Sequence, residues 1–486
     1  MSGHPTKITH LVDMGDSLSD RGSLNKRELF GFIPMSYLSG LRGKSPRGRF
    51  TNGFLWGDFV AATTVEEFKL EQIRKKLNLN NDPVCNADVV DDILTHTDEL
   101  KDNEKSFSLN DDKHISFKGE RFARFYCEGG LTAHDYSSDF TTHPVLEVTR
   151  RILATLGSKR EQLLADDKKY NISNLEKAET LVVEWSGAND LITANERPSH
   201  DAADKAVRER INNIEQLINN GYRNFVLFNL PDLSLIPRYQ RQSKDEQINA
   251  SECTDYFNRQ LQEKSLELIK KYQDSVPINL SVFDVHTEFN KIYNNPEEYK
   301  FHRDKLKSPF VESEPFKENQ HNSVDQKEHI SPAEGYMFWD DVHPTADVHD
   351  RLAVIFKEKY YGKVFKFEPP GVETDVSLIL HRIQLRAYLM SRSTDTKRKE
   401  KGELLNHFIF EIQSKQGNLE GIDRFISEFT IDPNYSKILT HQNPITDFFR
   451  NKTTTQSEDD IAALQNAIRA HLAPISENNE AHISKQ

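Results

Sequence analysis

The sequence predicts an α/β fold with a parallel sheet, followed by a C-terminal all-helical domain or extension. Two observations lead to this prediction. Through the first two-thirds of the 486 residues, short β-rich runs alternate with segments of helical periodicity, as in parallel sheets with helices on both faces. After Pro369-Pro370-Gly371 the remaining pattern is helical. In parallel sheets, sites form at the carboxyl ends of the strands, so functional residues are expected there.

The first strand is predicted at Ile8–Val12, an apolar run that leads into Gly15-Asp16-Ser17-Leu18. The later elements are expected in this order: a strand at 181–185, a helix at 201–220 that ends at Gly221, a strand at 225–228, a helix at about 247–272 and a strand at 278–285. The C-terminal helices are predicted from apolar residues that share one face: Val376, Ile379, Leu380, Ile383 and Ala387, and later Ile461, Leu464, Ile468 and Leu472. Residues 457–460, Ser-Glu-Asp-Asp, resemble a capping box that opens this last helix.

These elements predict a first domain over residues 1–368, a helical domain over 372–474 and a disordered tail over 475–486. Two charged stretches, near 98–114 and 296–330, interrupt the first domain and are expected to be surface insertions. The second insertion precedes the last motif described below. It is either a lid or regulatory loop, or a solvated loop without function.

Composition narrows the functional classes. Charged residues make up 29% of the chain and the net charge is −13, which argues against a nucleic-acid-binding protein but leaves peripheral membrane contact open. The three cysteines have neither disulfide-framework nor metal-site spacing, so no metal and no cofactor are expected. We see no signal peptide and no run near the ~20 apolar residues of a membrane span. The protein is therefore expected to be cytoplasmic where it is made, or exported by a signal-independent secretion system into a target cell.

Ser17 is the first candidate for catalysis, because it follows a strand directly and lies in a tight turn. A serine hydroxyl is a poor nucleophile until a base, usually a histidine oriented by a carboxylate, takes its proton. Asp340 and His343 offer both groups three residues apart. Asp341 is a rival for the carboxylate role, but the three-residue spacing favours Asp340. The Asp-x-x-His spacing alone is weak evidence, because residues 111–114 repeat it inside a charged insertion.

Two further segments could supply hydrogen-bond donors to the oxyanion of an attacked ester. Gly129 and Gly130 form a tight turn where a backbone N–H can approach a substrate closely. Asn189 follows the strand at 181–185 and presents a side-chain amide. Each segment alone is more often a structural turn, but their order after the serine and before the Asp/His pair favours an active site. The order also differs from that of α/β-hydrolases, whose serine lies mid-chain within Gly-x-Ser-x-Gly.

These four blocks resemble those of the GDSL esterases and lipases, also called SGNH hydrolases. The resemblance covers roughly residues 7–365 and includes three further segments, 48–56, 229–237 and 256–261. It implies a flavodoxin-like three-layer sandwich. The chain departs from the family pattern at Met14 and at Arg21-Gly22-Ser23, and neither change removes a catalytic atom.

The resemblance also implies a role for each block. Ser17 would be the nucleophile and His343 the base, with Asp340 orienting the imidazole. The oxyanion hole would consist of the Ser17 amide, Gly130 and Asn189. Gly130 is chosen because the Gly-Gly pair before Leu-Thr aligns with the family's Gly-Gly-Ala-Thr, and Gly129 is the fallback.

The segments at 48–56 and 229–237 resemble the lipase-like branch, with bacterial phospholipases A, lysophospholipases and glycerophospholipid–cholesterol acyltransferases. The leading hypothesis is a serine esterase that attacks lipid esters through an acyl-enzyme on Ser17. One alternative is a carbohydrate or small-molecule ester hydrolase. Another is a targeting or effector protein whose C-terminal helical region binds a protein partner or a membrane.

Overall fold

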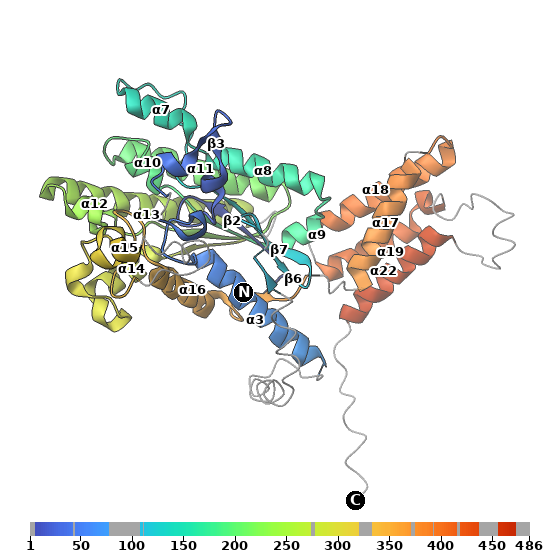
Figure 1. Ribbon diagram of the computed structural model, residues 1–486. Helices are drawn as coiled ribbons and strands as arrows, with labels where there is room; N and C mark the ends of the chain where they lie inside the picture. The colour runs from blue at the N-terminus through green and yellow to red at the C-terminus, as the bar shows by residue number, and fades with distance from the viewer. Residues whose placement is uncertain are drawn as a thin grey trace, which may run out of the picture. The chain divides into compact units, whose positions relative to one another are not determined.

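The computed structural model describes residues 5–41, 44–76, 107–109, 111–273, 278–319, 333–370, 375–391, 393–415, 418–436 and 455–472. The chain divides into two compact units, Met1–Pro370 and Gly371–Gln486, which we call the sheet unit and the helical unit and describe separately (Figure 1). The expected tail at 475–486 lies outside the described residues, as do residues 98–106 of the charged stretch near 98–114.

The sheet unit is built on a seven-stranded sheet with the strand order β10-β9-β8-β2-β7-β6-β5. The strands are β2 (His10–Gly15), β5 (Phe107–Ser108), β6 (His114–Phe117), β7 (Glu120–Cys127), β8 (Thr180–Trp185), β9 (Asn224–Phe228) and β10 (Asn279–Phe283). From β10 to β7 all neighbours pair in parallel, whereas β6 and β5 are antiparallel at the edge. The α/β fold with a mostly parallel central sheet is therefore confirmed.

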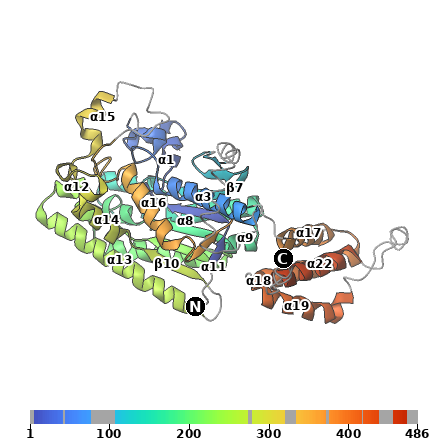
Figure 2. The ribbon, with the colours of Figure 1, turned by 90° about the horizontal axis from the view of Figure 1, so that it is seen from below.

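Helices cover both faces of this sheet (Figure 2). Helices α3 (Trp56–Lys76) and α16 (Ala346–Tyr360) lie on one face, while α11 (His200–Asn219) and α13 (Lys244–Tyr272) lie on the other. The remaining longer helices are α7 (Pro144–Ile152), α8 (Leu156–Lys169) and α14 (Val285–Asn294). The short α-helices of the unit are α1 (Ser23–Lys26), α2 (Met35–Leu38), α9 (Asn174–Ala178), α10 (Ala188–Ile192), α12 (Pro237–Gln240) and α15 (Glu314–Asn319). The core between the layers is apolar, and its central strands β8 and β9 are buried along their whole length.

The edge of the sheet contains short strands that the sequence did not single out. Within the stretch near 98–114, which we expect to be a surface insertion, the described residues are half-buried or exposed and include β5, which pairs with β6. Ile115 and Phe117 of β6 are buried in the sheet core. The apolar run at 8–12 is also divided between two sheets. Its first residue ends β1 (Thr6–Ile8), which pairs with β11 (Phe365–Phe367), while its last three residues lie in β2.

The helical unit contains α17 (Asp375–Ser391), α18 (Thr396–Ser414), α19 (Leu419–Ile431) and α22 (Gln456–Leu472). It has its own apolar core, which includes the residues expected on one face of the first and last helices. The capping box of α22 lies two residues earlier than expected. The Thr455 hydroxyl accepts the Glu458 N–H at 3.3 Å, and the Glu458 carboxylate accepts the Thr455 N–H at 3.3 Å. Ser457, the expected first residue of the box, is instead buried in the first turn.

Candidate functional site

Three neighbouring strands bring the first three sequence blocks to one edge of the sheet. Gly15 at the end of β2 pairs with Cys127 of β7 and with Trp185 of β8. Ser17 therefore follows β2 by two residues, and Gly130 and Asn189 follow the ends of β7 and β8. Since carboxyl ends of parallel strands meet at the same edge, these residues gather there, as the sequence predicted.

The turn that carries Ser17 is fixed on both sides. The Asp16 carboxylate accepts the Leu18 N–H at 3.0 Å, and the Asp16 N–H donates to the Trp185 carbonyl at 3.2 Å. Gly15 has to be glycine, because a Cβ there would lie 2.5 Å from the Trp185 carbonyl oxygen. Within the described part of the chain, the Ser17 N–H has no hydrogen-bond acceptor, so it is available to a substrate.

The structure brings Ser17, His343 and Asp340 into one hydrogen-bonded chain. His343 Nε2 lies 2.6 Å from Ser17 Oγ, and His343 Nδ1 lies 2.8 and 2.9 Å from the two Asp340 carboxylate oxygens. An ionised carboxylate can only accept, so Nδ1 carries the proton and Nε2 is left to accept from the serine hydroxyl. This is the geometry that a general base needs to activate a nucleophile.

Asp340 is held ionised and oriented. Its Oδ1 also accepts the backbone N–H groups of Val342 at 2.8 Å and His343 at 2.6 Å. Burial acts to raise the pKa of this carboxyl, but the His343 imidazole and these hydrogen bonds bring the pKa below its ordinary value. The rival Asp341 is engaged elsewhere, since its carboxylate pairs with Arg238 at 2.8 Å and its carbonyl accepts the Arg238 N–H at 2.9 Å. The geometry therefore favours Asp340.

The candidate oxyanion-hole residues differ in whether their N–H groups already donate a hydrogen bond within the protein. Gly129 donates its N–H to the Asp20 carboxylate at 2.8 Å, whereas the Gly130 N–H has no acceptor among the described residues. Gly130 also adopts a φ of +79°, which favours glycine. The Asn189 amide is oriented by bonds at both ends, with Nδ2 on the Leu131 carbonyl at 3.1 Å and Oδ1 accepting from Thr193 at 2.7 Å. One N–H of this amide remains available.

Asp20 is a residue that the sequence did not single out. Its carboxylate accepts four backbone N–H groups, those of Gly22, Ser23, Leu24 and Gly129, at 2.6–3.1 Å. It thereby links the loop after β2 to the turn that contains Gly130. The sequence could not reveal that Asp20 links these two segments, because Gly129 lies 109 residues further along the chain.

The segment at 48–56 also has a structural role at the site. Thr51 donates its hydroxyl to the Pro344 carbonyl at 3.1 Å, and the Asn52 side chain accepts the Ala346 N–H at 2.8 Å, so both hold the chain just after His343. The Phe50 ring lies against the His343 imidazole, with 4.8 Å between their centres. The sequence matched this segment to the family without predicting that it positions His343.

A buried ion cluster supports the same segment and explains one departure from the family pattern. Arg21 Nε lies 2.8 Å from one Asp58 carboxylate oxygen, and Arg49 Nε lies 3.0 Å from the other. All three side chains are almost fully buried. Both arginines lower the pKa of Asp58 against the opposing effect of burial. Arg21 is therefore a structural residue, and the Asp58 carboxylate offsets part of the charge of the two arginines.

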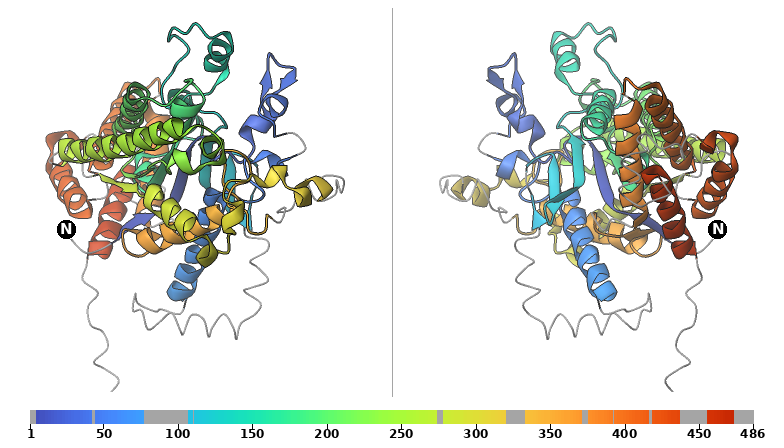
Figure 3. Two further views of the ribbon diagram at one scale, coloured as in Figure 1. Left: turned by 90° about the vertical axis from the view of Figure 1, so that its left-hand side faces the viewer. Right: turned by 90° about the vertical axis from the view of Figure 1, so that its right-hand side faces the viewer.

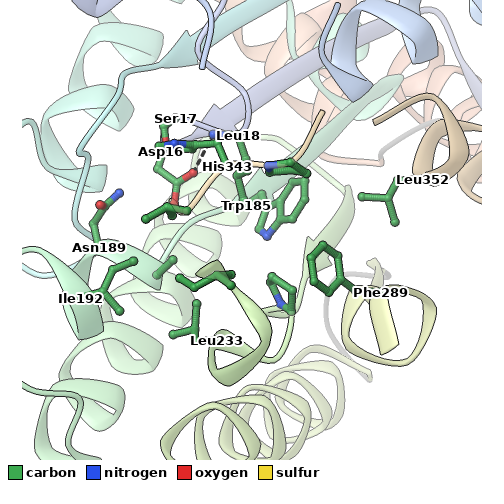
Figure 4. A pocket seen from close by; sticks show the side chains of 15 residues that line it. Asp16, Ser17, Leu18, Trp185, Asn189, Ile192, Leu233, Phe289, His343 and Leu352 are labelled. Atoms are coloured by element: carbon green, nitrogen blue, oxygen red, sulfur yellow. Dashed lines mark hydrogen bonds between the residues drawn. The ribbon is translucent and has the colours of Figure 1, made fainter. Parts of the chain in front are cut away.

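Ser17, Asn189 and His343 line one pocket, whose empty volume of about 540 Å³ includes its open mouth. Most of the other lining residues are apolar: Leu18, Trp185, Ala188, Ile192, Pro231, Leu233, Ile236, Phe289, Val342, Pro344 and Leu352. Figure 4 shows Ser17 and His343 at one end, with Ile192, Leu233 and Phe289 lying below them in this view. Gly130 and Asp340 lie outside this lining.

The described part of the second insertion, residues 296–319, packs beside the Asp/His segment. It contains three 3-10 turns, η3 (Pro296–Tyr299), η4 (Arg303–Lys305) and η5 (Phe310–Glu312), before α15. Phe310 is 1% exposed, and its N–H donates to the Phe338 carbonyl at 3.0 Å. The Val311 N–H donates to the Trp339 carbonyl at 2.9 Å. This part therefore supports the chain that carries Asp340, while the expected lid residues at 320–330 lie outside the described residues.

The Asp16 carboxyl gives a test of the buried site through stability. Burial raises its pKa from 3.8 to about 7, so between pH 4 and 7 the folded protein holds a proton that the unfolded chain has lost. The free energy of unfolding should therefore fall as pH rises through this window, by at most about 1.4 kcal/mol per pH unit, and level off above pH 7. Asp16→Asn cannot ionise and should lose this part of the decline.

Urea unfolding followed by tryptophan fluorescence at pH 5, 6, 7 and 8 measures this effect. All three tryptophans, Trp56, Trp185 and Trp339, lie in the sheet unit, so the signal reports that unit. The variant should gain stability relative to the wild type as pH rises towards 7. Parallel stability curves for the two proteins would show that Asp16 does not titrate in this range.

No group of three or more His, Cys, Asp or Glu among the described residues is arranged to hold a metal ion. No described helix is both long enough and apolar enough to cross a membrane.

Comparisons with known proteins agree with the geometry. A family model described as GDSL-like Lipase/Acylhydrolase matches residues 11–355. The phosphatidylcholine-sterol acyltransferase of Aeromonas hydrophila is 27% identical over 389 residues, which cover 73% of this chain and 91% of the relative.

Two further relatives come from other bacteria. The thermolabile hemolysin of Vibrio parahaemolyticus is 23% identical over 362 residues, and the secreted effector protein SseJ of Salmonella typhimurium is 25% identical over 355 residues. Each match covers 72% of this chain but only 63% of the relative, so the chain spans less than two thirds of these two proteins. Because the family model matches well over half of its residues, this chain belongs to the GDSL-like lipase/acylhydrolase family.

Proposed function

We propose that this protein hydrolyses or transfers the acyl group of lipid esters through an acyl-enzyme on Ser17. The observation that carries the proposal is the 2.6 Å contact between Ser17 Oγ and His343 Nε2 at one end of an apolar pocket. The serine provides the nucleophile, the imidazole takes its proton, and the pocket accommodates a hydrocarbon chain beside them.

The reaction follows from the donors and acceptors in place. As Ser17 Oγ attacks the ester carbonyl, its proton moves to His343 Nε2, and Asp340 stabilises the imidazolium. The carbonyl oxygen becomes an oxyanion, which in this proposal accepts hydrogen bonds from the N–H groups of Ser17 and Gly130 and from the Asn189 amide. The C–O bond to the alcohol then breaks, and the leaving oxygen takes the proton from Nε2. Water, or a second alcohol, attacks the acyl-enzyme by the reverse route.

The lining of the pocket favours lipid esters over carbohydrate esters. Beyond the catalytic end, the lining side chains are aliphatic, aromatic or proline, with Phe289 and Leu352 contributed by helices. A sugar in this pocket would lose hydrogen bonds to water without replacing them, whereas an acyl chain gains from burial. The name of the Aeromonas relative, a phosphatidylcholine-sterol acyltransferase, is consistent with the same class of substrate.

A product analysis tests this function and separates hydrolysis from transfer. Purified protein incubated with phosphatidylcholine vesicles should release fatty acid and lysophospholipid, detected by mass spectrometry. With cholesterol in the vesicles, cholesteryl ester should form if a sterol can reach the acyl-enzyme. Ser17→Ala is the matched control and should form no product. Activity on acetylated sugars combined with none on vesicles would favour a carbohydrate esterase instead.

Delivery into another cell is a further part of the proposal, supported by the similarity to a secreted effector protein of Salmonella. In this proposal the helical unit, which has a separate apolar core, contributes contact with a protein partner or membrane in the target cell. Immunodetection in producing and neighbouring cells tests the idea. Finding the protein only in the cells that make it, under every secretion condition, would contradict it.

A further inference from the structure

Two neighbouring segments of the sheet unit expose large apolar side chains to solvent. The first is the hairpin of β3 (Glu28–Leu29) and β4 (Ile33–Pro34) with helix α2, and the second is α7 with the loop before it. Seven side chains from these segments form what we call the exposed apolar surface: Phe30, Phe32, Tyr37, Leu38, Phe140, Val145 and Val148. Their exposed fractions run from 57% to 88%. Single exposed apolar residues are common on protein surfaces, but several gathered on neighbouring segments mark an interaction site.

The tip of the hairpin exposes Phe30, whose backbone conformation is unfavourable for a phenylalanine. Phe30 has a φ of +54°, a left-handed conformation that bulky residues rarely adopt and that suits Asn or Gly. Its side chain nevertheless remains 78% exposed, so no packing against the core offsets this strain. The hairpin turn itself requires this conformation, because the Phe32 N–H donates to the Leu29 carbonyl at 3.3 Å and both Phe30 and Gly31 have positive φ. An exposed phenylalanine where such a turn favours asparagine points to a function for the side chain.

Helix α7 is likewise placed without burying any of its residues. Val145 and Val148 are three residues apart and share one face of the helix, which points to solvent. Arg150 holds the helix in place, because its guanidinium donates to the Ala194 carbonyl and the Asn195 side chain, both at 2.8 Å. These two residues lie two and three positions after the end of α10, the helix that carries Asn189 and Ile192 of the pocket.

One side chain joins both segments to the oxyanion turn. Arg27, which precedes β3, donates to the Ile152 carbonyl at the end of α7 at 2.7 Å and pairs with the Glu128 carboxylate. Glu128 precedes the Gly129-Gly130 turn. The two segments therefore lie together beside the site, and in both views of Figure 3 the hairpin and α7 project from the same side of the sheet unit.

We propose that the exposed apolar surface docks this protein on a phospholipid bilayer, so that the Ser17 pocket takes its substrate from the lipid. The inference rests on the proposed function, because docking on a bilayer next to the Ser17 pocket is useful only if the substrate is a lipid of that bilayer. Aromatic and aliphatic side chains at this density bury readily at the lipid–water interface. The net charge of −13 opposes attraction to anionic lipids, so apolar insertion dominates and binding depends weakly on salt.

A triple variant, Phe30→Asn, Phe32→Ser and Phe140→Ser, tests the surface without touching the catalytic residues. Asparagine suits the φ of residue 30, and all three side chains are at least 71% exposed, so the fold should be retained. Each aromatic side chain buried in lipid contributes roughly tenfold or more to partitioning. Binding to phosphatidylcholine vesicles, measured by co-sedimentation, should therefore fall at least 100-fold, and hydrolysis of those vesicles should fall with it.

The kcat/KM on p-nitrophenyl butyrate, a soluble ester, should stay within twofold of the wild type. A matched control is Ile248→Ser with Leu266→Ser on α13, which removes side chains that are 46% and 55% exposed but lie outside the surface. This control should bind vesicles as the wild type does.

Three outcomes would overturn the docking surface. The first is unchanged vesicle binding by the triple variant, and the second is an equal loss of vesicle binding in the α13 control. The third is a wild-type dimer that becomes a monomer in the triple variant, because a second copy of the chain would then cover the exposed apolar surface. Failure of the proposed function is distinct. In that case the wild-type protein cleaves neither the soluble ester nor vesicles, whatever its vesicle binding.

Discussion

Alanine in place of Ser17 is expected to lower kcat/KM for ester hydrolysis by a factor on the order of 10⁶, as loss of the nucleophile does in other serine enzymes. The hydroxyl that His343 contacts at 2.6 Å would be gone, and the structure places no other hydroxyl against that nitrogen among its described residues. The oxyanion donors would remain, so residual activity above the uncatalysed rate is expected. Initial rates on p-nitrophenyl butyrate measure the loss.

Labelling with a fluorophosphonate probe gives an independent readout of the same change. The wild type should be labelled and Ser17→Ala should not. Ser19→Ala is a matched control from the same motif, because the Ser19 hydroxyl accepts the Trp56 indole N–H at 3.0 Å and lies away from the imidazole. This control should keep its label at some cost in stability. Full labelling of Ser17→Ala would identify a different nucleophile.

Asparagine in place of Asp340 should lower kcat by about 10⁴, the scale seen when a triad carboxylate becomes an amide. An amide at this position cannot stabilise the imidazolium, and its NH₂ group favours the tautomer of His343 whose Nε2 is protonated and unable to accept. The backbone bonds from Val342 and His343 could still reach the side-chain oxygen, so the loop should keep its shape. Steady-state kinetics with a circular dichroism spectrum of each variant measures both effects.

The neighbouring carboxylate provides the comparison. Asp341→Asn should change kcat less than tenfold, because it weakens only a partly exposed pair with Arg238. A second comparison is Asp111→Asn, since Asp111 and His114 repeat the same spacing with 3.2 Å between imidazole and carboxylate, but no described serine lies against this imidazole. This variant should keep full activity. A larger loss in Asp341→Asn than in Asp340→Asn would move the carboxylate role to residue 341.

The parts of the fold that the sequence predicted well are those with strong local signals. Strands β8 and β9 are continuous apolar runs because both of their faces are buried, and the helices α11 and α13 repeat apolar residues with the helical period. The edge strands β5 and β6 gave no comparable signal, since they are short and lie among charged residues. The start of α22 was misplaced because several residues near position 456 suit a helix cap equally well.

Some residues of the candidate site could be found from local sequence patterns, whereas others depend on contacts between distant segments. Chain order and spacing were enough to nominate Ser17, Asn189 and His343, which the structure places around one pocket. Local spacing favoured Asp340 over Asp341, but it could not show that Asp341 pairs with Arg238, which lies 103 residues away. The contact between Asn52 and Ala346 spans 294 residues. Such long-range contacts depend on the folded topology, and no pattern within one segment reveals them.

The four bonds accepted by the Asp20 carboxylate couple the activity of this protein to its melting. Three of the bonds order the loop after β2, and the fourth ties the turn after β7 to that loop, so opening one segment alone breaks the bond that joins them. Heat that separates these two strands also disorients the Gly130 N–H. Inactivation and unfolding of the sheet unit should therefore share one transition, and variants selected for looser loops would exchange heat resistance for turnover.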